Sequence, residues 1–178
     1  GNPMIDIHLA LPRRAEAQLL ALTQGAGHLS GEGIREVLQL IRRDYPDSYE
    51  RGYTTPAGGA LQTAVISAKR GGEPRFHGAV GTDSWGRRIQ GFLTASGVSV
   101  SLQYAELPTG AMIYCSFTEQ GSSTGHLRIG APGAGHAFRV SHDQSLGDQW
   151  VYLEGFLSPH SGVWEHKDLY RGSSACTL

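Results

Sequence analysis

The fold is decided by residues 58–97, which read GGALQTAVISAKRGGEPRFHGAVGTDSWGRRIQGFLTASG. The small apolar residues after the first glycine pair predict a buried helix over 60–70, which ends at the next glycine pair. A short apolar strand follows over 75–80, and its distance from the helix suits a βαβ unit with a right-handed crossover. A second helix, from Ser84 to Gly97, completes an α/β pattern.

The glycine pair Gly58-Gly59 opens the first of these helices. Because glycine has no Cβ and the first amides of a helix lack internal partners, a ligand can approach the backbone closely there. The amide donors and the positive end of the helix dipole suit hydroxyl groups or anions. A tight turn between a strand and a helix is the alternative interpretation of the same pair.

The segments before this stretch supply further elements. Residues 1–10 alternate apolar and polar side chains, as expected for the end of a strand. A short amphipathic helix is predicted over 13–23, and a second helix begins with Ser30 as its cap and stops at 44–46. The polar segment 47–56 is predicted to be a loop.

The segments after it are richer in strands. Residues 98–104 are predicted to be extended, and turn residues separate the alternating run 111–118 from 124–129, which predicts an antiparallel hairpin. Residues 150–157 have the apolar composition of a strand, whereas the tail from Ser158 has no periodic apolar pattern.

The composition is that of one ordinary soluble domain, with 178 residues, 39% hydrophobic content and a formal net charge of -1. No basic excess indicates nucleic acid, and no stretch approaches the roughly 20 apolar residues of a membrane span. Cys115 and Cys176 lie far apart without metal-ligand spacing. We therefore expect reduced thiols, in the cytoplasm or in an organellar matrix such as that of the mitochondrion, with a disulfide as the alternative. The start at Gly1 rather than Met predicts an upstream segment, for which a cleaved presequence is one interpretation.

Several short motifs follow one another along the chain: Gly1-Asn2-Pro3-Met4-Ile5-Asp6-Ile7, Gly58-Gly59-Ala60, residues 76–86, Ala95-Ser96-Gly97-Val98 and Pro108-Thr109-Gly110. In this order they resemble the N-terminal half of the PfkB-type carbohydrate kinases, the ribokinase and adenosine kinase family. The resemblance covers most of residues 1–159. The Gly-Asn-Pro opening is similar to the adenosine-kinase-like branch.

The resemblance implies an α/β fold, namely an incomplete Rossmann-like ribokinase fold with a parallel sheet, flanking helices and a β-hairpin lid. It divides the chain into a truncated ribokinase-like domain at 1–159, with lid strands at about 98–129, and a divergent tail at 160–178. The tail is expected to be extended or bound to a partner.

The resemblance also implies a sugar-binding site. In the family, an aspartate at the position of Asp6 binds sugar hydroxyls, and the pair Gly58-Gly59 belongs to the same site. Capping of a nearby loop is the alternative role for Asp6. Where the family has an asparagine in the first turn after the glycines, this chain has Thr63, whose shorter side chain can bond its own helix carbonyl instead. This departure weakens the case for sugar binding.

The family's catalytic base, anion hole and ATP-magnesium site lie in its C-terminal half, which the sequence lacks. We therefore expect no catalytic residue and no cofactor here, with ATP and magnesium only if a C-terminal half exists. The string 130–136 resembles the family's Gly-Ala-Gly-Asp stretch with a histidine in place of the aspartate, which would make Gly133, Gly135 and His136 a pseudo-anion-hole. Its position directly after the hairpin favours chance similarity in a glycine-rich loop.

The histidines form no pattern typical of a metal site. His136 and His142 are six residues apart, and so are His160 and His166. Ligands on one helical face need a spacing of about three or four residues. Scattered surface or loop histidines explain them better.

Three functions fit these observations. We favour a non-catalytic relative of the PfkB and adenosine kinases, a pseudoenzyme that acts as a structural or interaction subunit, with a protein partner covering the open sheet. One alternative is an N-terminal fragment of an active ATP-dependent kinase that phosphorylates a primary hydroxyl of a sugar or nucleoside. The other is a binding module that keeps the sugar cleft without the chemistry.

Overall fold

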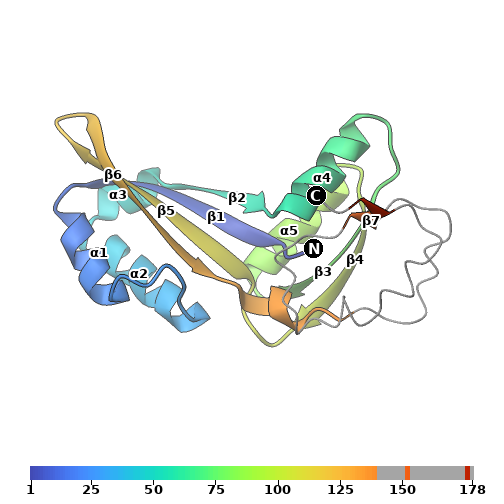
Figure 1. Ribbon diagram of the computed structural model, residues 1–178, viewed down its shortest axis with the longest axis horizontal. Coiled ribbons are helices and arrows are strands. Elements are labelled where there is room, and N and C mark those ends of the chain that lie inside the picture. Colours follow the sequence, from blue (N-terminus) through green and yellow to red (C-terminus); the bar gives the residue numbers. More distant parts are fainter. Residues whose placement is uncertain (140–150, 153–174, 177–178) are drawn as a thin grey trace.

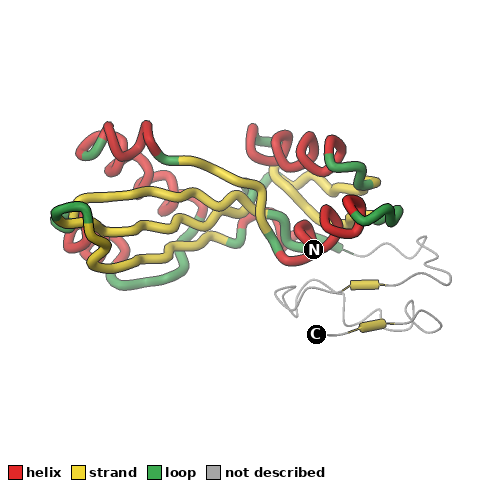
Figure 2. The backbone as a smooth tube through the Cα atoms, turned by 90° about the horizontal axis from the view of Figure 1, so that it is seen from above, coloured by secondary structure: helices red, strands yellow, loops and turns green. Residues whose placement is uncertain are grey.

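The computed structural model describes residues 1–139, 151–152 and 175–176. In this part of the chain, a four-stranded sheet lies at one end and a two-stranded parallel sheet at the other (Figure 1, Figure 2). Helices flank both sheets, so the predicted α/β fold is confirmed. Among the described residues, no helix is both long and apolar enough to span a membrane.

The four-stranded sheet has the order β2-β1-β5-β6. At its centre β1 (Met4–Pro12) runs parallel to β5 (Gly110–Glu119). Each central strand has an antiparallel neighbour at the edge, β2 (Tyr53–Ala57) beside β1 and β6 (Ser122–Ala131) beside β5. The predicted hairpin is therefore present as β5 and β6.

The smaller sheet is a parallel βαβ unit. Its strands are β3 (Arg75–Gly81) and β4 (Ser99–Ala105), and α5 (Ser84–Ala95) connects them. The βαβ crossover was predicted at the helix over 60–70. That helix, α4 (Gly59–Lys69), instead connects two different sheets, and the crossover helix is the next one, α5. The lid strands were predicted within residues 98–129. In this range β4 pairs with β3 of the small sheet, whereas β5 of the hairpin pairs with β1 of the large sheet.

Three helices contact the four-stranded sheet from one side (Figure 1): α1 (Ala15–Thr23), α2 (Gly31–Asp44) and α3 (Pro46–Arg51). The predicted cap of α2 is confirmed, since the Ser30 hydroxyl accepts a hydrogen bond from the Gly33 amide at 3.1 Å.

The prediction of a loop over 47–56 is wrong, because this segment contains most of α3 and β2. The helix has only 6 residues, too few to show a periodic apolar stripe. The strand is an edge strand whose residues are mostly exposed or half-buried, so its sequence is polar.

Alternation along β1 separates side chains that face the core from side chains on the opposite face of the sheet. Ile5, Ile7, Leu9 and Leu11 are at most 5% exposed and form part of the hydrophobic core. Each such burial contributes about 1.5–3 kcal/mol to stability. The residues between them, Asp6 among them, point to the other face of the sheet because successive side chains in a strand alternate.

The chain crosses between the two sheets at its first residues. The Gly1 amino group donates a hydrogen bond to the His77 carbonyl oxygen of β3 at 2.6 Å, and the chain then enters the other sheet as β1. Arg88 of α5 donates to the Thr54 carbonyl oxygen of β2 at 2.8 Å. Both contacts hold the small sheet and its helix against the base of the large sheet.

The carboxylate of Asp83 makes a further connection between the βαβ unit and the large sheet, which we call the Asp83 clasp. Asp83 caps α5 by accepting from the Gly86 amide at 2.8 Å, and it accepts from the Thr109 amide at 2.8 Å and the Thr109 hydroxyl at 2.7 Å. The Thr109 hydroxyl in turn accepts from the Gly81 amide at 3.0 Å. Burial acts to raise the pKa of Asp83, but these hydrogen bonds outweigh it and the pKa is lowered. The clasp thus ties α5 and β3 to the start of β5.

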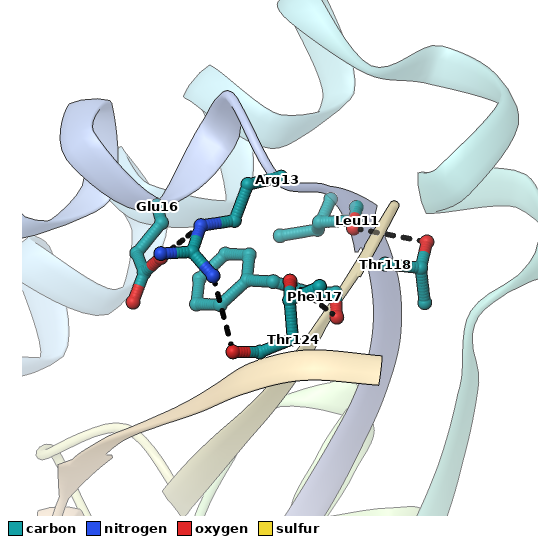
Figure 3. A network of polar contacts seen from close by, with 6 residues as sticks. All are labelled: Leu11, Arg13, Glu16, Phe117, Thr118 and Thr124. Carbon is teal, nitrogen blue, oxygen red and sulfur yellow. Dashed lines mark hydrogen bonds and ion pairs between the residues drawn. The ribbon is translucent and has the colours of Figure 1, made fainter. Parts of the chain in front are cut away.

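A second polar network closes the far end of the large sheet (Figure 3). Arg13 forms an ion pair with Glu16 at 3.0 Å and donates to the Thr124 carbonyl oxygen at 3.1 Å. The Thr118 hydroxyl donates to the Leu11 carbonyl oxygen at 3.4 Å. The network joins the start of α1 to β6 and β5 to β1, so it supports the sheet rather than a ligand site.

Candidate functional site

Asp6 lies in the middle of the sheet face that points away from α1, α2 and α3. Its cross-strand neighbours are Thr55 on β2 and Met112 on β5. The Asp6 Oδ1 atom is buried, and it has no hydrogen-bond partner among the described residues. Burial raises the pKa of the Asp6 carboxyl, and the nearby His8 partly opposes this. A buried acceptor without a donor costs free energy, so this oxygen is suited to receive a hydrogen bond from a ligand.

A row of stacked rings crosses the same face beside Asp6. His8 stacks on Tyr53 with 4.6 Å between ring centroids and on Tyr114 with 4.9 Å, at interplanar angles of 9° and 8°. The guanidinium of Arg128 lies 5.6 Å from the centroid of the Tyr114 ring. Burial raises the pKa of Tyr114, the charge of Asp6 adds to the rise, and Arg128 opposes it. Aromatic surface and a carboxylate therefore lie together on one sheet face.

The glycine pair lies at the end of β2, three residues beyond Thr55. Gly58 has a φ of 119°, and a Cβ there would lie 2.7 Å from the Asn2 carbonyl oxygen. Close packing against the first residues of the chain therefore requires glycine at this position. Gly59 is the exposed first residue of α4, where the helix begins without a side-chain cap. The structure thus brings the helix N-terminus and Asp6 to adjoining parts of β1 and β2.

The side chain of Thr63 is engaged within its own helix. Its hydroxyl donates to the Gly59 carbonyl oxygen at 2.9 Å, as expected from the shorter side chain. The hydroxyl proton is therefore used inside α4. What remains at this position is an acceptor and a methyl group, in place of the carboxamide that the family carries.

The predicted pseudo-anion-hole is a short 3₁₀ turn, Gly133–Ala137, rather than the start of a long helix. The Ala134 amide donates to the Pro108 carbonyl oxygen at 2.7 Å. A Cβ at Gly133 would lie 2.3 Å from the same oxygen, and one at Gly135 would lie 1.6 Å from Asn2 Oδ1. Tight packing accounts for both glycines, which favours the interpretation as chance similarity. The side chain of His136 lies outside the described residues.

No metal centre is formed by the described part of the chain, where no group of three His, Cys, Asp or Glu side chains is placed to hold an ion. Cys115 is a free thiol in the core, and burial raises its pKa to about 12. A thiol so rarely ionised is a poor nucleophile and a poor metal ligand.

The sequence motifs predicted Asp6 and the glycine pair as site residues, and they gave no indication of the row of stacked rings. Alternation along residues 4–12 indicated that Asp6 and His8 share a face, and this signal was available. Nothing local indicated that Tyr53 and Tyr114 lie on either side of His8, because they are 61 residues apart in the sequence. The partner of Asp83 was equally hidden, although Asp83 and Thr109 both belong to the motifs that carry the resemblance.

The four-stranded sheet and the parallel βαβ unit, with their flanking helices, form a partial ribokinase-like fold. No family model matches the sequence, and no curated protein sequence matches it either. Solved structures do match. Adenosine kinase of Anopheles gambiae, in complex with a di(adenosine) tetraphosphate, has a TM-score of 0.59 at 18% identity, over 97% of this chain and 44% of its own.

Two further structures give the same result. Adenosine kinase of Schistosoma mansoni, in complex with adenosine, has a TM-score of 0.58 at 17% identity, over 97% of this chain and 43% of its own. A probable sugar kinase of Rhizobium etli has a TM-score of 0.54 at 19% identity, over 78% and 39%. The resemblance drawn from the motifs is thus confirmed at the level of the fold. The chain spans less than half the length of these kinases.

Proposed function

We propose that this chain forms the substrate-recognising part of a PfkB-type kinase and binds the hydroxyl groups of a sugar or nucleoside. The observation that carries the proposal is the buried Asp6 Oδ1 atom, which has no donor among the described residues. A hydroxyl group of a ligand would supply that donor, and hydrogen bonds to charged acceptors contribute about 1.5–3 kcal/mol.

The surroundings of Asp6 support a ring-bearing ligand. The row of Tyr53, His8, Tyr114 and Arg128 provides aromatic surface along the same sheet face. His8 is stacked between the two tyrosines and Arg128 lies over Tyr114, so a flat ring would contact the ring edges and the exposed Tyr53. This favours a nucleoside, which carries both hydroxyls and a base, over a free sugar.

Phosphoryl transfer needs groups that the described residues do not supply. They offer no cluster of ligands for magnesium, and the amide of Ala134 in the glycine-rich turn is bonded to Pro108. These residues therefore do not fit an ATP-magnesium site, and we derive no catalytic step from them. Under the proposal, ATP and magnesium would be held by a C-terminal half of the kinase.

Calorimetric titration of the 178-residue chain with adenosine and with ribose tests the proposal. We expect saturable binding of adenosine, weaker binding of ribose, and at least about tenfold weaker binding of both to an Asp6→Ala variant. Asp47→Asn is the matched control, since Asp47 is an exposed carboxylate on α3. Equal affinities of the parent chain and the Asp6→Ala variant would refute the assignment.

A second candidate function is that of a non-catalytic structural or interaction subunit. The specific observation in its favour is the Thr63 hydroxyl, which is bonded to Gly59 instead of being offered to a ligand. A Thr63→Asn variant separates the candidates: adenosine binding gained only by this variant would favour a subunit that has lost its substrate.

Under this second candidate we also propose a protein partner. The parallel strands β3 and β4 form a sheet of two strands, and parallel sheets are usually covered on both faces and at their edges. Size-exclusion chromatography with light scattering tests the partner. A fully folded monomer of the 178-residue chain would contradict it.

A further inference from the structure

A recess lies on the side of the large sheet that α1, α2 and α3 cover, which is the opposite face from Asp6. It has a volume of about 420 Å³, within the range of small-molecule sites. Its walls come from α2, from the start of α5, from the segment between β4 and β5, and from the ends of β5 and β6. Gly31 permits this arrangement, because a Cβ there would lie 2.5 Å from Pro108 Cγ.

One wall carries two arginines. Arg35 and Arg42 are seven residues apart on α2, so they lie two turns apart on the same helical face, with Gln39 between them. Both are exposed, and within the described residues neither forms an ion pair. The Arg42 guanidinium lies 5.9 Å from the centroid of the Tyr49 ring, which also lines the recess. This contact orients one guanidinium at the rim.

Apart from Asp83 and Thr109, the rest of the lining is apolar. Ala111 and Ala131 are buried at 2% and 4% exposure and close the bottom, while the half-buried Leu38 and Pro108 line the sides. Trp85, at the start of α5, adds a flat aromatic surface. A largely apolar recess with two guanidinium groups suits an anion attached to an apolar ring.

We propose that this recess binds a small organic anion, a carboxylate or phosphate carried on a flat apolar ring. Asp83 is the acidic side chain in its lining, and its carboxylate already accepts three hydrogen bonds from Gly86 and Thr109. The lining thus holds two guanidinium groups against one carboxylate, which leaves it a net positive charge. Helix α2 packs on the large sheet, and Trp85 lies in α5 of the βαβ unit. A bound anion therefore contacts both the large sheet's helix layer and the βαβ unit, and it stabilises the junction between them.

The test uses naphthoate, naphthyl phosphate and the neutral naphthalenemethanol as probes with the full chain. Calorimetry reports binding, and the melting temperature reports the stabilised junction. We expect both anions to bind and to raise the melting temperature, with the stronger of the two identifying carboxylate or phosphate as the preferred group. The neutral probe should bind at least about tenfold more weakly.

Two substitutions locate the site. In an Arg35→Gln/Arg42→Gln variant, anion binding should weaken at least about tenfold, while adenosine binding at Asp6 stays unchanged. Arg43→Gln is the matched control, because Arg43 lies next in α2, pairs with Asp44 at 2.6 Å and does not line the recess. Equal binding of the neutral probe, equal binding by the double variant, or no binding at millimolar anion would each overturn the proposal. None of these outcomes bears on the proposed kinase-like function.

Discussion

Replacing Asp83 with alanine removes hydrogen bonds from the Gly86 amide at 2.8 Å, the Thr109 amide at 2.8 Å and the Thr109 hydroxyl at 2.7 Å. Loss of the helix cap costs about 0.5–2 kcal/mol, and each further bond to a charged acceptor contributes about 1.5–3 kcal/mol. Because the Asp83 side chain is only half-buried, we use the lower ends of these ranges. The free energy of unfolding should fall by about 3.5 kcal/mol.

Urea unfolding followed by circular dichroism measures this loss. The slope of the free energy against urea should stay unchanged, and the melting temperature should fall by about 7–14 °C for a chain of this size. Asp83→Asn keeps an oxygen for the Gly86 amide and the Thr109 hydroxyl but offers no acceptor to the Thr109 amide, so it should lose about 1.5 kcal/mol. Thr109→Val removes the hydroxyl while it keeps the shape, so the double variant measures the coupling between the two side chains.

The pH dependence of the Asp83→Asn effect follows from the lowered pKa of Asp83. A carboxyl whose folded pKa lies below its unfolded value, about 3.9, stabilises the fold above that value and loses this contribution as pH falls. The difference in stability between parent and Asp83→Asn should therefore be constant near neutral pH and shrink below about pH 4. An unchanged urea midpoint for Asp83→Ala, or strictly additive effects with Thr109→Val, would refute the reasoning.

Three further predictions use the same measurements. Burial raises the pKa of Asp6, so its ionised form destabilises the fold; Asp6→Asn should raise the urea midpoint at neutral pH and change it little below about pH 3.9. Gly135→Ala places a Cβ 1.6 Å from Asn2 Oδ1 and should lower stability by about 1–3 kcal/mol, a loss that Asn2→Ala partly relieves in thermal unfolding. In a Cys176→Ser variant, Cys115 should react with a disulfide reagent only in denaturant, because burial raises its pKa to about 12; rapid reaction of the folded chain would contradict its placement in the core.

Much of the local structure could be predicted, because its signals lie within single elements. The apolar stripe and the Ser30 cap predicted α2, and the alternation with its intervening turn predicted the hairpin. The bond from Thr63 to the Gly59 carbonyl was also foreseen, since both groups lie within one turn of helix. The prediction for segment 47–56 was wrong because its short helix and edge strand have no periodic pattern that could signal them.

Pairings between distant segments could not be predicted in the same way. The sequence determined that Asp6 alternates with core residues and that Gly58 lies where a strand meets a helix, because periodicity and backbone freedom are local properties. Only the tertiary structure decided that β2 and β5 flank β1. This pairing leaves Asp6 Oδ1 without a donor within the described part of the chain, stacks His8 between two tyrosines and closes a recess between α2 and α5. These features depend on contacts between residues tens of positions apart, which packing of the whole core selects and no local pattern encodes.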